Sequence, residues 1–147
     1  MATQQIASHR ENAEIYHGAA LCKQKSIELL QEINLPKGLL PLNDLVEVGY
    51  NRTTGFVWLK QQRGIEHRFR AISRTVFYDS EVTAFVEERR MRKLTGVKSK
   101  ELLIWVTISD IYIDERNPTK ITFATPAGLG RSFPVSAFDE EEGQEKK

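Results

Sequence analysis

The chain has 147 residues, of which 40% are hydrophobic and 28% charged, and its formal net charge is +1. This size and composition are typical of one soluble globular domain, which we expect over residues 1–138. No run approaches the roughly 18 apolar residues of a transmembrane helix, and so balanced a charge does not indicate a nucleic-acid-binding protein.

The N-terminal segment lacks the features of a secretory signal. "MATQQIASHRENAEIYHG" has no basic start followed by an apolar stretch, which predicts an intracellular, cytoplasmic protein. Cys22 is the one cysteine, so no internal disulfide can form, in agreement with a reducing compartment.

Residues 9–33 predict an amphipathic helix. Small and apolar residues recur there at the helical period, whereas charged residues lie mostly off that stripe. Pro36 and Gly38 then end the helix, because proline cannot continue the backbone hydrogen-bond ladder. The stripe consists of Ile15, Ala19, Cys22, Ser26, Leu29, Leu30 and Ile33.

From residue 42 onward the pattern is typical of β-structure. Six segments are short, rich in β-branched and aromatic residues, and separated by Gly, Asn, Asp or Pro, which predicts strands. "NRTTG" and "QRG" are typical of hairpin connections, and Pro118 in "ERNPT" indicates a further turn. The predicted strand segments are 45–50, 55–61, 65–71, 74–79, 101–114 and 120–125.

Three further segments complete the chain. Residues 80–94 fit either a helix or a strand by local pattern, although the strands around them favour a sheet. Residues 125–134 predict a loop, and the acidic segment "DEEEGQEKK" at 139–147 predicts a disordered tail. One helix followed by six to eight strands predicts a sheet that curls or closes, with the helix over an opening or one face.

Six ordered motifs carry a family resemblance: "LPKGLLP" (35–41), "EVGY" (47–50), "TGFVWL" (54–59), "YD" (78–79), "LTGVK" (94–98) and "KELLIWV" (100–106). Between Ile27 and Phe138 the chain resembles the plant family catalogued as domain of unknown function 538. The resemblance implies a mainly β pseudobarrel over residues 42–138, in which a folded mixed sheet of about seven strands follows the helix.

The resemblance also implies two classes of activity. The family has been likened to bactericidal/permeability-increasing protein, which binds lipid, and an esterase-like activity on chlorophyll has been suggested for some members. Neither proposal brings catalytic residues that could be placed on this chain. Many members have a signal peptide, which this sequence lacks, so an extracellular role is not expected.

Four large side chains are candidates for holding an apolar ligand. Alternation along a strand puts Phe56 and Trp58 on one face of their strand, and Leu103 and Trp105 on one face of theirs. If the barrel has a ligand-sized interior, these four residues would line it. The alternative is that the rings simply fill a core.

The segment 87–100, "EERRMRKLTGVKSK", is the densest charge cluster outside the tail. On a sheet edge it would hold a phosphate, an anionic lipid headgroup or another acidic partner. The alternative is that its charges protect an edge strand from pairing or keep one face in water. The basic residues are Arg89, Arg90, Arg92, Lys93, Lys98 and Lys100.

No constellation in the sequence is typical of catalysis or metal binding. Ser132 lacks the "GxSxG" context of an activated serine, although His67 could serve it as a base. Cys22 lies on the apolar stripe of the predicted helix, which is typical of a core residue. His9 and His17 are eight residues apart and lack the spacing of metal ligands, so neither a metal nor another cofactor is expected.

The sequence therefore predicts a non-enzymatic binder of an amphipathic or lipid-like molecule, with possible contact to a membrane surface. An esterase-like hydrolase and a protein-interaction module that uses the helix or the tail are the alternatives.

Overall fold

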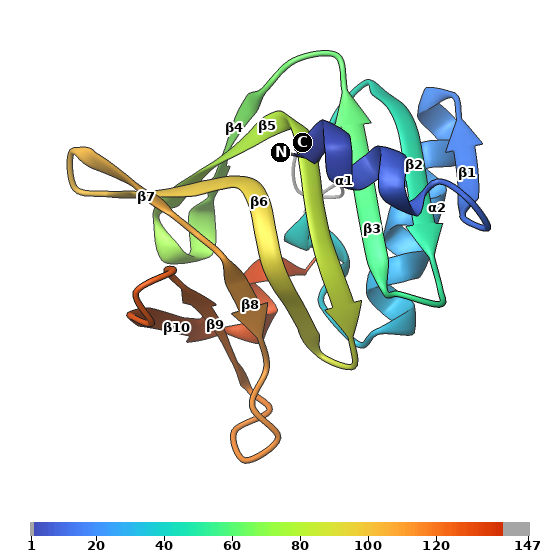
Figure 1. Ribbon diagram of the computed structural model, residues 1–147. Coiled ribbons are helices and arrows are strands. Elements are labelled where there is room, and N and C mark those ends of the chain that lie inside the picture. The colour runs from blue at the N-terminus through green and yellow to red at the C-terminus, as the bar shows by residue number, and fades with distance from the viewer. Residues whose placement is uncertain (1, 140–147) are drawn as a thin grey trace.

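Ten strands form one sheet in the computed structural model, which describes residues 2–139 (Figure 1). The helical elements are α1 (Ala2–His9), α2 (Ala19–Glu32), and the short 3-10 helices η1 (Lys37–Leu39), η2 (Arg70–Ile72) and η3 (Val135–Phe138). The strands are β1 (Glu14–His17), β2 (Leu45–Asn51), β3 (Phe56–Gln61), β4 (Ile65–Phe69), β5 (Arg74–Glu87), β6 (Arg90–Glu101), β7 (Ile104–Thr107), β8 (Asp110–Tyr112), β9 (Lys120–Ala124) and β10 (Gly130–Pro134).

The sheet is open and antiparallel. Its strands follow the order β1-β2-β3-β5-β6-β8-β9-β10, with β4 paired to β5 and β7 paired to β6. The mainly β prediction with helix before the sheet is confirmed. The resemblance implied about seven strands in a mixed sheet, whereas all strand pairs among the described residues are antiparallel, and the sheet has ten strands and does not close.

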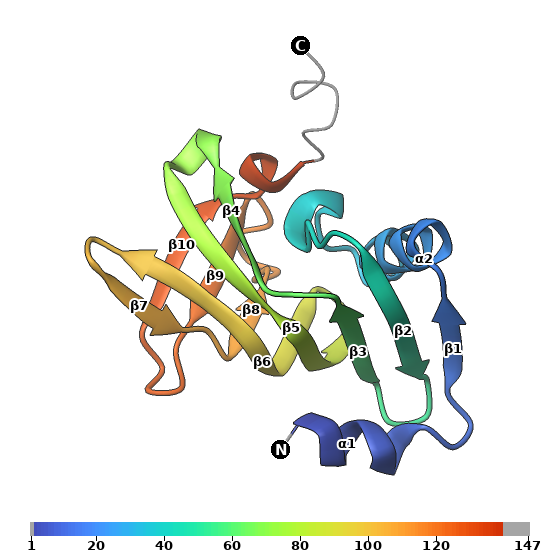
Figure 2. The same cartoon turned by 90° about the horizontal axis from the view of Figure 1, so that it is seen from above.

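Two long strands make the sheet branch. One half of β5 pairs with β4 and the other half with β3, while β6 pairs with β8 near its start and with β7 near its end. Gly96 lies at the bend with φ of 82°, where a Cβ would collide with the carbonyl oxygen of Glu81. As a result, the β6–β7 hairpin projects from the body of the molecule (Figures 1 and 2).

The two α-helices cover opposite faces of the same part of the sheet. Figure 2 shows α1 on one side of β2 and β3 and α2 on the other. Beneath α2, η1 and η3 lies the larger core, which includes Leu30, Leu39, Val82 and Phe138. A smaller core beneath α1 contains Ile6, Phe56 and Trp58. Because both of its faces are buried, β3 is apolar along most of its length.

The N-terminal segment differs from the helix predicted over residues 9–33. Residues Glu14–His17 form β1 and pair with β2, and α2 begins only at Ala19. Gly18, with φ of 97°, makes the change of direction between the two. The predicted C-terminal end of the helix agrees closely with the end of α2. Asn34 adopts φ of 62°, and the Leu35 amide donates to the Leu30 carbonyl, as at many helix C-termini.

The later segments agree with the predictions except at three places. Residues 80–94 belong to β5 and β6, which confirms the strand interpretation, and "NRTTG" joins β2 and β3 as the predicted hairpin connection. "QRG" was also predicted as a hairpin connection, but it joins β3 to β4, and both of these strands pair with β5 and not with each other. Residues 101–114 were predicted as one strand but form the turn after β6, then β7 and β8. Residues 130–134, predicted as loop, form β10. The predicted acidic tail lies outside the described residues beyond Asp139.

Candidate functional site

The β6–β7 hairpin presents a different set of side chains on each face. Lys100 pairs with Trp105 and Glu101 pairs with Ile104, so Leu102 and Leu103 form a two-residue turn. Leu102 has φ of 57°, a conformation that bulky residues rarely adopt. Because side chains alternate along a strand, Ile104 and Val106 share one face of β7 and Trp105 points to the other.

An apolar pocket of about 350 Å³ lies between this hairpin and the β9–β10 hairpin. Ile104 and Val106 line it from β7, and Phe123 and Phe133 line it from β9 and β10. Leu129, in the turn between β9 and β10, lies at its margin and is exposed. This volume and lining match the lower end of the range for small-molecule sites.

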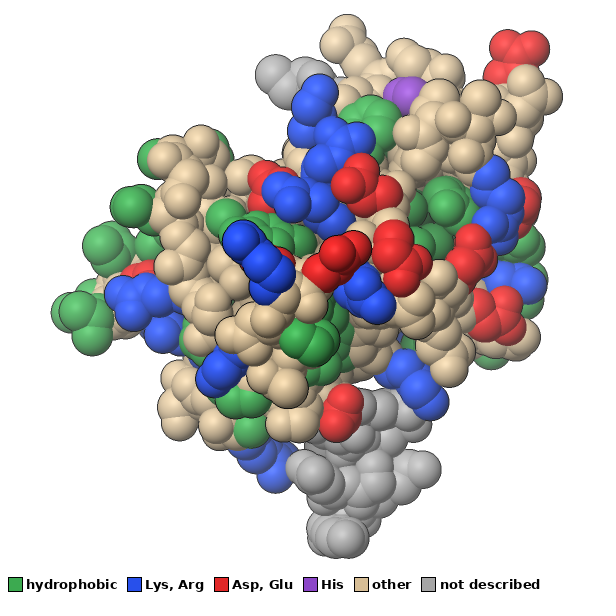
Figure 3. Space-filling model, turned by 90° about the horizontal axis from the view of Figure 1, so that it is seen from below, with side chains coloured by type: hydrophobic (Ala, Val, Ile, Leu, Met, Phe, Trp, Pro, Cys, Tyr) green, Lys and Arg blue, Asp and Glu red, His purple; other side chains and the backbone are tan. Residues whose placement is uncertain are grey.

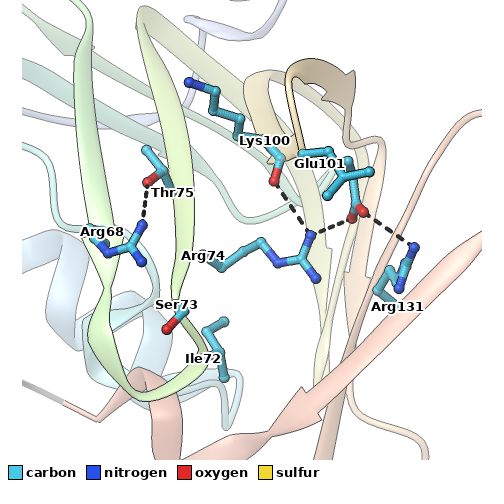
Figure 4. A pocket seen from close by; sticks show the side chains of 9 residues that line it. Arg68, Ile72, Ser73, Arg74, Thr75, Lys100, Glu101 and Arg131 are labelled. Carbon is cyan, nitrogen blue, oxygen red and sulfur yellow. Dashed lines mark hydrogen bonds and ion pairs between the residues drawn. The ribbon is translucent and has the colours of Figure 1, made fainter.

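A polar pocket of about 490 Å³ adjoins the apolar one (Figure 4). Its lining includes three guanidinium groups, from Arg68, Arg74 and Arg131, and one carboxylate, from Glu101. Lys100 contributes its backbone carbonyl, which accepts a hydrogen bond from Arg74, while its ammonium points away from the pocket. The Glu101 carboxylate lies 2.7 Å from the Arg74 guanidinium and 3.2 Å from that of Arg131. One carboxylate cannot neutralise three guanidinium groups, so the pocket keeps a positive excess that would attract an anion.

The two pockets share a wall. Glu101, Leu102 and Arg131 line both, and the Arg74 guanidinium lies 5.3 Å from the centre of the Phe133 ring. Arg74 and Glu101 are mostly buried, whereas the Arg131 side chain is largely exposed. The arrangement can therefore hold a molecule whose apolar part lies against β7 and whose anionic part meets the guanidinium groups.

The structure divides the four predicted apolar ligand residues between two places. Phe56 and Trp58 are fully buried in the core beneath α1 and line neither pocket. Leu103 is exposed at the turn, and the Trp105 ring contacts Phe77 and the Lys100 ammonium. In the described part of the chain, no barrel interior is lined by all four residues. The face of β7 opposite Trp105, which carries Ile104 and Val106, lines the apolar pocket instead.

Trp58 belongs to a network centred on a buried carboxylate. Its indole N–H donates to Glu47 at 2.7 Å, and Arg10 donates to the same carboxylate at 2.8 and 3.3 Å. The His17 Nε2 lies 2.9 Å from it. A Cβ on Gly49 would collide with the indole, so Gly49 is what allows the ring to lie on β2. The motifs "EVGY" and "TGFVWL" thus describe one packing unit.

Glu47 remains ionised over a wide range of pH. Hydrogen bonds from Arg10, then from Trp58 and His17, lower its pKa from the ordinary value of 4.5 to about 2, although burial opposes the shift. With several donors directed at one mostly buried carboxylate, the arrangement fixes Arg10, which follows α1, against β2.

The predicted basic cluster does not form one anion site. Arg92 pairs with Glu87 at 2.9 Å and Arg90 pairs with Asp110 at 3.2 Å. Lys93 lies over the Phe85 ring, whereas Lys98 is at the far end of β6 near Trp105. Arg89, in the turn after β5, lies 4.0 Å from Glu88. Figure 3 shows positive and negative side chains interleaved across one face of the molecule.

The candidate nucleophiles have other partners. The Ser132 hydroxyl exchanges a hydrogen bond with Thr122 at 2.8 Å, and the His67 ring packs edge-on against Phe69. Cys22 is fully buried and its thiol donates to the Tyr16 carbonyl. Among the described residues, no three His, Cys, Asp or Glu side chains are grouped as metal ligands, and no helix is long and apolar enough to cross a membrane.

The environment of Cys22 gives a first prediction. Burial raises the pKa of its thiol, and the thiolate is the reactive form. We expect a disulfide reagent to label Cys22 in the native protein at least about a hundredfold more slowly than in concentrated guanidinium chloride. Comparable rates in the two solutions would contradict the buried position.

Sequence reasoning missed most of the residues that line the two pockets. Arg131 lies 57 residues after Arg74 in the chain, and neither these two residues nor Arg68 belong to a motif. The one available signal is the run "ELLIWV", where apolar side chains fall on both faces of a strand that follows a charged residue. A strand that is apolar on both faces needs a second apolar partner, here supplied by β9 and β10.

Comparison with known proteins identifies the family but no individual relative. The family described as "Protein of unknown function, DUF538" matches residues 26–139, and the chain belongs to this family. The match begins within α2 and ends just after η3, so it covers both pockets and the Glu47 carboxylate, and leaves out α1 and β1. Searches of curated proteins and of solved structures found no match to the chain.

Proposed function

We propose that this protein is a non-enzymatic binder of an amphipathic anion, such as a fatty acid or a similar lipid-like molecule. The observation that carries the proposal is the shared wall of the two pockets, where Leu102 and Arg131 face both an apolar and a cationic space. A ligand with a hydrocarbon part and an acidic end would satisfy both spaces at once.

The volumes favour a small ligand. At about 350 Å³, the apolar pocket lies near the lower limit of the usual range for ligand sites, so a short acyl chain or a compact ring system fits better than a bulky molecule. The exposed Arg131 side chain can reorient toward an anion, while Arg74 is held in place by Glu101. Together the two guanidinium groups provide several donors for a carboxylate or phosphate.

Binding without chemistry agrees with the groups that line the pockets. None of the described lining residues is a histidine or a cysteine, so no neutral base or thiol is available there. Glu101 is the one carboxylate of the two linings, and it is paired with two guanidinium groups. A carboxylate so paired is a weak base and is better suited to holding the arginines in place.

The test uses 1-anilinonaphthalene-8-sulfonate, a fluorescent amphipathic anion, and its displacement by laurate. Ile104→Glu places a charge in the apolar pocket and should weaken binding of the probe by about tenfold or more. Leu21→Glu makes the same change at an exposed leucine on α2 and serves as the matched control. Equal affinities of the two variants would contradict the pocket assignment, provided that thermal unfolding shows both to be folded.

Replacing Arg131 tests the polar half separately. Arg131→Ala should weaken laurate binding by about threefold, because an exposed arginine contributes modestly, and should leave dodecanol binding unchanged. Displacement of the fluorescent probe by each ligand gives both affinities. The same loss for the acid and the alcohol would contradict the role given to the guanidinium.

A further inference from the structure

The two hairpin turns beside the apolar pocket expose large apolar side chains at one end of the molecule. Leu102 and Leu103 are 93% and 92% exposed at the β6–β7 turn, and Leu129 is 73% exposed at the β9–β10 turn. Ile104 continues the same apolar tip. Figure 3 shows hydrophobic side chains at the left edge of the molecule, where Figure 1 shows the β6–β7 hairpin projecting.

This tip costs free energy when it is left in water. A group of adjacent leucines at a projecting turn is unlike the isolated exposed leucine that is common on protein surfaces. The turn also holds Leu102 at φ of 57°, where glycine or asparagine would be less strained. A bulky apolar residue in a strained and exposed turn indicates that the side chain has a role outside the folded monomer.

Basic residues lie behind the tip. Lys98 and Lys100 are exposed on one face of β6, and the Lys100 ammonium lies 5.6 Å from the centre of the Trp105 ring. Arg131 is exposed on β10, and Arg68 lines the adjoining polar pocket. From the end of the hairpin inward, the leucines therefore come first, then Trp105 and Lys100 beside each other at one level, and then Lys98.

This order matches the layers of an anionic membrane surface. Leucines enter the acyl region, tryptophan prefers the interface, and lysine and arginine meet the headgroup phosphates. A narrow projecting turn also suits insertion into a fluid layer, whereas a stable protein interface requires a broad complementary patch.

We propose that the tips of the β6–β7 and β9–β10 hairpins dock this protein onto anionic lipid bilayers. Leu103 and its neighbours insert while Lys98, Lys100 and Arg131 bind the headgroups. The docking surface stands independently of ligand binding in the apolar pocket. Since Leu102 and Leu129 also line that pocket, docking would bring the pocket next to the bilayer.

The experiment is sedimentation of the full chain with phosphatidylcholine vesicles, either pure or containing roughly 30% phosphatidylserine. We expect binding to the anionic vesicles that weakens with added salt, and at least about tenfold weaker binding to the neutral ones. Leu103→Glu should lower binding to anionic vesicles by at least about tenfold, whereas Leu21→Glu on α2 should not change it.

Two further measurements test the layers separately. Lys98→Glu/Lys100→Glu should abolish the preference for anionic vesicles, while Lys37→Glu/Lys120→Glu, which makes the same change in net charge at exposed positions elsewhere, should retain it. Brominated phosphatidylcholine should quench tryptophan emission of the native protein, and Trp105→Phe should remove that quenching because Trp58 is buried.

Failure of docking is distinguishable from failure of the pocket. Probe binding measured without vesicles reports on the pocket alone, so its loss with vesicle binding intact would overturn the proposed function only. The docking proposal is overturned if the native protein does not sediment with anionic vesicles, or if Leu103→Glu and Leu21→Glu sediment alike. It is also overturned if sedimentation equilibrium shows a dimer that Leu103→Glu dissociates while vesicle binding is unchanged.

Discussion

Trp58→Ala is expected to lower the free energy of unfolding by about 3–5 kcal/mol, whereas Trp105→Ala should lower it by less than about 1 kcal/mol. The Trp58 side chain is 0% exposed and packs with Phe56 and Ile6 beneath α1. Its removal leaves a cavity in the smaller core and removes one donor from the Glu47 carboxylate. Trp105 is 38% exposed on the projecting hairpin, so its loss leaves no comparable cavity.

Urea denaturation followed by circular dichroism measures both variants without relying on tryptophan emission. The total stability of a domain this size is about 5–15 kcal/mol, so Trp58→Ala could be largely unfolded at the start of the titration. Trp58→Phe then provides a measurable second variant, since it keeps an aromatic ring and loses the N–H donor. Equal losses for the Trp58 and Trp105 variants would show that the smaller core contributes little to stability.

Nothing local to the two tryptophans distinguishes them in the sequence. Each follows an apolar residue, and alternation places Phe56 and Trp58 on one face of β3, where both are buried beneath α1. Leu103 lies in the turn before β7, so alternation does not determine its face relative to Trp105. Alternation does not reveal which face is covered. In β3, the face that carries Trp58 is buried because α1 covers it. In β7, the covering hairpin of β9 and β10 lies on the face opposite Trp105, so Trp105 stays partly exposed.

Most of the strands and the β2–β3 hairpin were predictable, because their sequence signals are short in range. Apolar alternation and turn residues such as Gly55 lie within the elements that they define. β1 was not predictable in this way, because Glu14–His17 gains its strand conformation from pairing with Tyr50–Glu47. The spacing of Ile15 from Ala19 fits a helix equally well, so a distant partner decides the outcome.

The residues of the candidate site were not predictable from the sequence. Apolar residues near cations favoured an amphipathic ligand, which stays a prediction, and the two pockets combine apolar and cationic groups through other residues. The particular cations were not predictable, because Arg74 and Arg131 approach each other through Glu101 across a folded sheet. The dense cluster at 89–93 was a stronger signal in the sequence, but three of its arginines have acidic neighbours in the structure.

Glu47 gives the second large prediction, a stability that depends on acid pH. The pKa of its carboxyl is about 2 in the folded protein against an ordinary value of 4.5. Ionisation therefore stabilises the fold fully above pH 4.5, and this contribution is lost as pH falls through the interval toward 2. A difference of this size corresponds to about 3 kcal/mol.

The measurement compares urea unfolding of the native protein and Glu47→Gln between pH 6 and 2. Glu47→Gln should be less stable by about 3 kcal/mol at pH 6, and the two free energies should converge near pH 2. Other carboxyls with lowered pKa values, such as those of Glu14 and Asp114, are present in both proteins, so their contributions cancel in the difference.

Glu28→Gln provides the matched control. Gln24 and Lys25 lower the pKa of the Glu28 carboxyl, but this group is exposed on α2, so water and salt screen its interactions and the variant should follow the native curve closely. Parallel curves for the native protein and Glu47→Gln would mean that the Arg10 and Trp58 hydrogen bonds do not favour the ionised carboxylate. Convergence would instead establish that α1 and its core are attached to the sheet through a charge that must remain ionised.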